Sequence, residues 1–85
     1  MEKYGKVFKL MDIIINDRTV PRNIRAAVKQ AKENLEGEGE EVVKISAAIH
    51  TLDEIINDPN MPLYTRTQIW NVVGQLEEIR RELEK

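Results

Sequence analysis

The stretch Leu52-Asp53-Glu54-Ile55-Ile56-Asn57-Asp58 decides the fold, because it repeats a segment that occurs 41 positions earlier. That earlier segment is Met11-Asp12-Ile13-Ile14-Ile15-Asn16-Asp17, and the likeness extends over residues 11–36 and 52–77. A repeat of this length is typical of a helical hairpin that cannot bury its apolar face alone and stacks on a second copy. The sequence therefore predicts two stacked helical hairpins.

The spacing of the apolar residues predicts four helices, because they recur at three- and four-residue steps. Two of these helices end near the Asn-Asp pairs, since both residue types form turns. The helix after each turn begins at Pro21 or Pro62, because the missing N–H of proline has no partner in a first turn anyway. The expected core residues are Val7, Leu10, Met11, Ile14, Val20, Ile24, Ala27, Val28, Ala31, Leu35, Val42, Ile45, Ile49, Leu52, Ile56, Ile69, Val72, Val73, Leu76, Ile79 and Leu83.

Two further predictions concern the ends of helices. Thr19 and Asn60 lie at matching positions just before the prolines, and both residue types are common N-caps. Gly37 follows the second helix, where we expect it in the left-handed conformation that ends many helices. The segment 38–41 then links the two hairpins.

The predicted connections are all short, so neighbouring helices should run antiparallel. We therefore expect an all-α fold with one domain over residues 1–85. One hairpin should span about residues 2–36 and the other about residues 40–84. The Asp of each turn and the Arg that follows it resemble HEAT-type repeats in architecture, although the spacing from Asp17 to Arg25 is longer than in HEAT units.

The composition is that of a soluble helical protein. Charged residues make up 33% of the chain, and Ile, Val, Leu and Ala rather than aromatic residues supply its apolar surface. The chain has no cysteine, which excludes disulfides and thiolate zinc sites and fits a reducing interior. The apolar runs are too short to span a membrane, and lysines interrupt any secretory signal near the N-terminus. The expected location is the cytoplasm.

The charges are distributed unevenly along the chain. Residues 1–32 hold eight Lys and Arg against three acids, whereas residues 33–85 hold five against twelve. This asymmetry is explained either by attraction between the halves, within one fold or across a dimer, or by a basic surface for an anionic partner. The second helix carries four cations on one stripe away from its core face, and this basic stripe predicts RNA or DNA binding as an alternative function: Arg22, Arg25, Lys29 and Lys32.

The polar residues of the repeat are better explained by structure than by catalysis. Asp17 and Asp58 with Arg25 and Arg66 could act as acid–base groups with anion clamps. Their presence in both copies favours a structural role instead, with each Asp ordering its turn and each Arg donating to nearby carbonyls or to that Asp. A single histidine, His50, without cysteine or a metal-binding spacing makes a poor metal site. We expect no catalytic residue, no metal, no cofactor and no enzyme activity.

A second face of the fourth helix carries Leu63, Thr67, Trp70 and Gly74, which lie away from its main apolar stripe. A large Trp beside small Thr and Gly residues forms a projection next to a notch, a surface on which another helix or chain can dock. The alternative is that Trp70 fills space against the second helix within the monomer. The sequence thus predicts a non-catalytic interaction module that self-associates or docks on a larger protein, with no membrane and no small-molecule substrate among its partners.

The segments around the two prolines also resemble a known family. Val20-Pro21-Arg22-Asn23-Ile24-Arg25, residues 52–62 and Arg66-Thr67-Gln68-Ile69-Trp70-Asn71 are similar to sequences of the small archaeal proteins grouped as uncharacterised family 0147. The resemblance covers nearly the whole chain. It implies an all-helical fold and an archaeal cytoplasm, and it transfers no activity, cofactor or catalytic residue.

Overall fold

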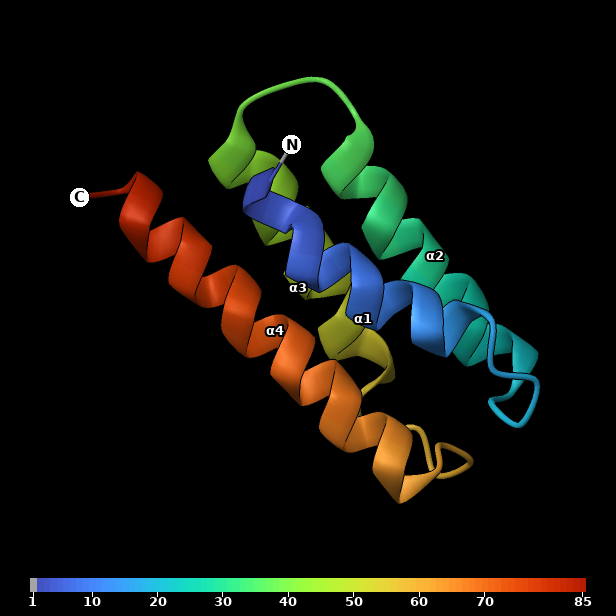
Figure 1. Cartoon of the computed structure of the whole chain (residues 1–85). Coiled ribbons are helices and arrows are strands. Elements are labelled where there is room, and N and C mark those ends of the chain that lie inside the picture. The colour runs from blue at the N-terminus through green and yellow to red at the C-terminus, as the bar shows by residue number, and fades with distance from the viewer. Residues whose placement is uncertain (1) are drawn as a thin grey trace.

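The computed structural model describes residues 2–85 and confirms the all-α fold (Figure 1). A short 3₁₀ helix, η1 (Glu2–Tyr4), leads into α1 (Gly5–Ile15), which is followed by α2 (Arg22–Glu36), α3 (Glu41–Ile55) and α4 (Leu63–Leu83). Within residues 2–85 there is no β-strand. None of the helices over this range combines the length and the apolar character that a membrane crossing requires.

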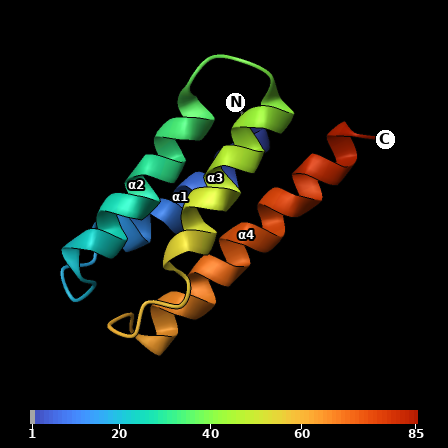
Figure 2. The same cartoon turned by 180° about the vertical axis from the view of Figure 1, so that it is seen from behind.

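The four helices form a bundle in which α1 packs on α2 and α4, and α3 packs on the same two helices. In Figure 1 α1 lies in front of α3, and in Figure 2, seen from the opposite side, it lies behind α3. The most extensive contact is between α2 and α3, which the sequence assigned to different hairpins. Helix α4 packs on both α3 and α1. The HEAT-like stacking of two hairpins stays a prediction.

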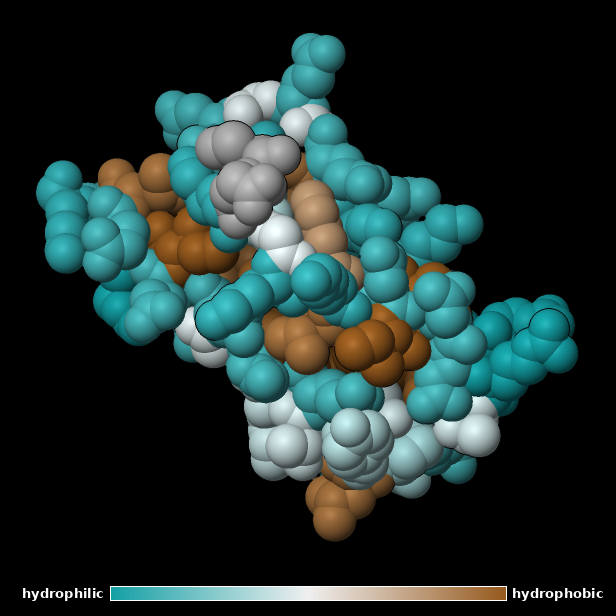
Figure 3. Space-filling view, viewed as in Figure 1, coloured by the Kyte–Doolittle hydropathy of each residue, from teal (hydrophilic) through white to brown (hydrophobic). Residues whose placement is uncertain are grey.

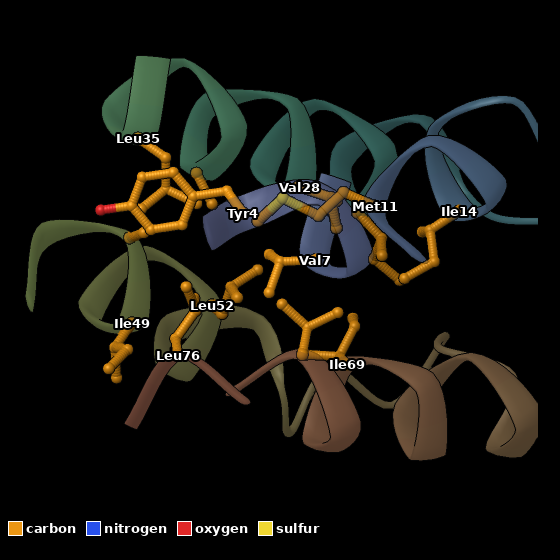
Figure 4. Close-up of a cluster of buried hydrophobic side chains, with 14 of the residues drawn as sticks. Tyr4, Val7, Met11, Ile14, Val28, Leu35, Ile49, Leu52, Ile69 and Leu76 are labelled. Atoms are coloured by element: carbon orange, nitrogen blue, oxygen red, sulfur yellow. The ribbon is translucent and has the colours of Figure 1, made fainter. Parts of the chain in front are cut away.

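The core consists of the apolar stripes of all four helices. Fully buried side chains come from α1, α2, α3 and α4, and Figure 4 shows how they meet between the layers. The predicted core residues Leu10, Ala27, Val42, Ile56, Val73, Ile79 and Leu83 are only partly buried. The other predicted core residues are buried, and the core also includes Tyr4, Ala48, Met61 and Thr65. The helical period therefore predicted the interior well.

The two turns of the repeat have matching hydrogen bonds. The side-chain oxygen of Asp17 accepts the backbone N–H of Thr19 at 2.9 Å, and that of Asp58 accepts the N–H of Asn60 at 2.8 Å. The prediction that Thr19 and Asn60 cap the next helices is therefore wrong. Pro21 and Pro62 occupy the N-cap positions themselves, and the helices begin directly after them without any side-chain cap.

The two repeat arginines donate to backbone carbonyls, which confirms their predicted structural role. Arg25 Nε donates to the carbonyl of Val20 at 2.9 Å. Arg66 makes two such bonds, from Nε to the carbonyl of Ile56 at 2.9 Å and from Nη2 to that of Asp58 at 3.0 Å. Ile56 is the C-cap residue of α3, whose last carbonyls have no intrahelical partners, whereas Val20 and Asp58 lie in the turns before α2 and α4.

The end of α2 differs from the prediction. Gly37 has φ −73° and ψ 179°, so it is extended and not left-handed. The positive φ occurs two residues later, at Gly39, where φ is 122°. A side chain at Gly39 would be strained, because L residues rarely adopt this conformation. The chain thus leaves α2 in an extended conformation and reverses at Gly39 instead.

A polar cluster fixes η1 to the start of α3. Lys3 Nζ lies 3.0 and 2.9 Å from the two carboxylate oxygens of Glu41, and the Tyr4 hydroxyl donates to the same carboxylate at 3.0 Å. The hydrogen bonds from Lys3 and Tyr4 lower the pKa of Glu41. Burial, with the nearby Glu41 as a further cause, raises the pKa of Tyr4 to about 12. The first residue of α3 therefore holds η1 in place.

The raised pKa of Tyr4 predicts a loss of stability at alkaline pH. Unfolded tyrosine ionises near its ordinary pKa of 10.0, so the unfolded state releases this proton first as the pH rises. Stability should therefore fall between pH 10 and 12, and it should fall less in Tyr4→Phe. In Tyr64→Phe, Tyr4 is the only tyrosine, and its ultraviolet absorbance should titrate near pH 12. Titration near pH 10 in the folded variant would contradict the prediction.

Candidate functional site

Helix α4 places all four residues of the predicted interaction surface in solvent. We call this surface, made of Leu63, Thr67, Trp70 and Gly74, the α4 face. The exposed fraction is 73% for Leu63 and 57% for Trp70, and Thr67 and Gly74 are also exposed. The sequence left open whether Trp70 packs on the second helix or points outward, and the structure places it outward. Its role in binding a partner stays a prediction.

The main apolar stripe of α4 is what forces the α4 face outward. Ile69, Val72 and Leu76 are fully buried against α1 and α3. Residues 63, 67, 70 and 74 recur at the same three- and four-residue spacing, so they share one side of the helix. Because the buried stripe lies on a different side, no element within residues 2–85 covers this second row.

Gly74 is an unusual residue for the middle of an exposed helix. Glycine there destabilises a helix by about 0.5–1 kcal/mol relative to alanine. A Cβ added at Gly74 would meet no atom within 4 Å, and the φ of Gly74 is not positive. Neither packing within the monomer nor backbone conformation therefore requires a glycine, and the notch that it leaves on the α4 face is open.

Three exposed large apolar residues were not predicted from the sequence. Tyr64 follows Leu63 in the first turn of α4 and is 72% exposed, Val43 of α3 is 62% exposed, and Ile13 of α1 is 54% exposed. Ile13 lines a shallow groove of about 360 Å³ between α1 and α4, together with Lys6, Lys9, Leu10, Asn71 and Gln75. Figure 3 shows apolar residues gathered over this junction and surrounded by hydrophilic ones. The run Ile13-Ile14-Ile15 contained the signal, because three consecutive helical residues cannot all face one core.

Two of the four cations of the basic stripe on α2 make contacts within the fold, and the other two are exposed. Arg25 donates to the carbonyl of Val20, and Lys32 pairs with Asp12 of α1 at 2.8 Å. The hydrogen bond to Asp12 raises the pKa of Lys32, whose Nζ also lies 5.6 Å from the centre of the Phe8 ring. Arg22 and Lys29 remain as exposed cations. The structure therefore does not present the four predicted nucleic-acid residues as one equally available surface.

Potential metal-binding side chains are scattered rather than gathered. Among residues 2–85, no three His, Cys, Asp or Glu side chains lie close enough together to hold a metal ion. His50 is exposed, and its Nε2 lies 3.5 Å from a carboxylate oxygen of Glu54. The absence of catalytic, cofactor and metal sites remains a prediction from the sequence.

Comparison with known proteins gives consistent matches to one family. The profile of a family described as "Uncharacterised protein family (UPF0147)" matches residues 1–79. The UPF0147 protein of Methanocaldococcus jannaschii is 62% identical over 72 residues, which cover 84% of this chain and 77% of that protein. The UPF0147 protein of Archaeoglobus fulgidus is 43% identical over 96% of this chain and 97% of its own length.

Two solved structures have the same fold. The crystal structure of a UPF0147 protein from Thermoplasma acidophilum is 32% identical, with a TM-score of 0.85 over 92% of this chain and 93% of the other. The crystal structure described as the unknown function protein MMP1188 is 49% identical, with a TM-score of 0.85 over 88% of this chain and 86% of the other. The likeness therefore extends from the sequence to the packing of the helices.

Proposed function

The chain belongs to the uncharacterised archaeal family UPF0147, and from the exposed residues of α4 we propose that it is a non-catalytic helical module that binds a protein partner in the cytoplasm. The observation that carries this proposal is the exposure of Leu63, Tyr64 and Trp70 on the surface of one helix. Large apolar residues are scattered singly on most protein surfaces, whereas a group of them marks an interaction site.

The kinds of residue on the α4 face support a protein partner. Tryptophan is enriched among the few residues that supply most of the binding energy at protein interfaces. Charged residues are depleted at the centres of such interfaces, and the α4 face from Leu63 to Gly74 contains none. A partner that covers Leu63 and Trp70 would remove their apolar surface from water, which favours association.

A nucleic-acid role has less support from the contacts within the chain. Binding to phosphates relies on several cations that act together. Two of the four cations of the basic stripe, Arg25 and Lys32, make hydrogen bonds inside the fold. Arg22 and Lys29 would have to supply the attraction, and the exposed aromatic Trp70 lies on α4 rather than beside them on α2.

Photo-crosslinking tests the proposal directly. A benzophenone amino acid at Tyr64, beside the α4 face, should form adducts with a protein when it is irradiated in extracts of the native cell. The matched control is position 23, the exposed equivalent of Tyr64 in the first repeat. Trp70→Ala should lower the adduct yield at position 64 by roughly fivefold or more, as truncation of a central interface residue usually does.

The same experiment contains outcomes that would overturn the proposal. Equal protein adducts at positions 64 and 23, with no effect of Trp70→Ala, would show that the α4 face is not a specific interface. Nuclease-sensitive adducts confined to position 23, which is next to Arg22, would favour nucleic acid instead. Circular dichroism before irradiation shows that each variant is folded.

A further inference from the structure

The partner of the α4 face can be inferred from the pattern of the face itself. We infer that it is a second copy of this chain, bound antiparallel so that Trp70 of each copy packs over Gly74 of the other. This inference rests on the proposed function, since it names the partner of the same surface. It goes further because it specifies the symmetry and the register of the contact.

The register follows from the spacing of residues along α4. Positions 77 and 81 continue the row of the α4 face, so the full row is 63, 67, 70, 74, 77 and 81. In a two-fold contact, residue i of one copy meets residue j of the other, and j meets i. An antiparallel pair centred between residues 70 and 74 therefore sets 70 against 74, 67 against 77 and 63 against 81.

Each of these three pairs is complementary. Trp70 is a large exposed side chain, and the position opposite it is Gly74, where the space around the backbone is open. Thr67 faces Glu77, whose carboxylate can accept the hydroxyl that donates to the carbonyl of Leu63 at 3.3 Å in the monomer. Leu63 faces Arg81, whose aliphatic stem can cover a leucine while its guanidinium stays in water.

Other registers of two copies fit less well. A contact centred on residue 70 would set two tryptophans against each other and hold the helices apart. A register that sets residue 63 against 74 and residue 67 against 70 would place Trp70 on Thr67 instead of on the notch at Gly74. Only the register centred between residues 70 and 74 gives each tryptophan of the pair a glycine to pack on.

Electrostatics and area set the expected strength of the dimer. Antiparallel helices place the positive end of one dipole beside the negative end of the other, and a net charge of −2 gives little repulsion. A stable interface buries about 800 Å² on each partner, roughly a seventh of the 5465 Å² surface of this chain. One helix face supplies less than this, so we expect a reversible dimer with a dissociation constant in the micromolar to millimolar range.

An exchange of the two central residues tests the register. Trp70→Gly removes the projection, and Gly74→Trp fills the notch, so each should weaken dimerisation by about tenfold or more. The double variant W70G/G74W again sets one tryptophan against one glycine and should dimerise within about threefold of the wild type. Sedimentation equilibrium measures all four proteins, and circular dichroism confirms their helicity. The double variant also keeps the composition of the wild type.

The outcomes separate this inference from the proposed function. A wild-type chain that stays monomeric at about 2 mM, above the expected range, would overturn the inference. A double variant that dimerises as weakly as the single variants would also overturn it. The exchange of Trp70 and Gly74 restores the contact only if the partner is a second copy that carries the same exchange. If the crosslinker at Tyr64 then captures another protein, the proposed function stands while the second copy is excluded. If it captures no protein, both are wrong.

Discussion

Replacement of Leu76 with alanine is expected to lower the free energy of unfolding by about 3–4 kcal/mol. Leu76 is fully buried in α4, and Figure 4 shows its side chain in the core cluster with Leu52 and Ile49 of α3. Removing three carbons there loses the free energy gained by transferring them from water to the core. It also leaves a cavity that the close-packed helices fill only in part. Equilibrium unfolding in urea, followed by circular dichroism, measures the loss.

Leu63→Ala is the matched control for this experiment. It is the same substitution in the same helix, but Leu63 is exposed, so its effect on the stability of the monomer should stay within about 0.5 kcal/mol. The two variants also separate folding from function. Leu76→Ala should weaken the fold itself, whereas Leu63→Ala should weaken association through the α4 face. Similar losses of monomer stability would contradict the packing described above.

Replacement of Arg66 with alanine is expected to cost about 2 kcal/mol of stability. Hydrogen bonds that involve a charged group contribute roughly 1.5–3 kcal/mol when buried and less when water can replace them. Arg66 makes two such bonds to the turn between α3 and α4, and its side chain is only partly buried. Loss of the side chain therefore frees two carbonyls that water satisfies in part. Urea unfolding at neutral pH provides the measurement.

The first repeat supplies the control for Arg66. Arg25 occupies the equivalent position but makes a single bond, to the carbonyl of Val20, so Arg25→Ala should cost about half as much, roughly 1 kcal/mol. Arg66→Lys should not restore stability fully, because an ammonium group lacks the forked donors that reach two carbonyls at once. Full rescue by lysine, or equal costs at the two arginines, would show that charge rather than hydrogen-bond geometry matters.

Sequence reasoning was most accurate where local rules apply. The three- and four-residue spacing of apolar residues predicted four helices and most of the buried positions, because burial of one side of a helix follows directly from its period. The Asn-Asp pairs and prolines predicted where the first and third helices end and the next ones begin. These features depend on neighbours within about one helical turn.

The same local rules failed where several backbone solutions were available. Gly37 and Gly39 lie two residues apart, and either could have supplied the positive φ that the link requires. Thr19 has the chemistry of an N-cap, but its hydroxyl and N–H both donate to Asp17. In each case the sequence contained the right kind of residue, and the path of the chain determined which hydrogen bonds it made.

The sequence by itself determined the all-α fold, the repeated turns and the family, because these depend on spacing along the chain and on recognisable segments. Only the tertiary structure decided which polar and aromatic residues are available to a partner. Lys32 meets Asp12, twenty positions away, and Tyr4 meets Glu41, 37 positions away. Trp70 is exposed because none of the helices described over residues 2–85 packs on its side of α4. Availability depends on which helices become neighbours, and that is a property of packing between distant segments rather than of any one of them.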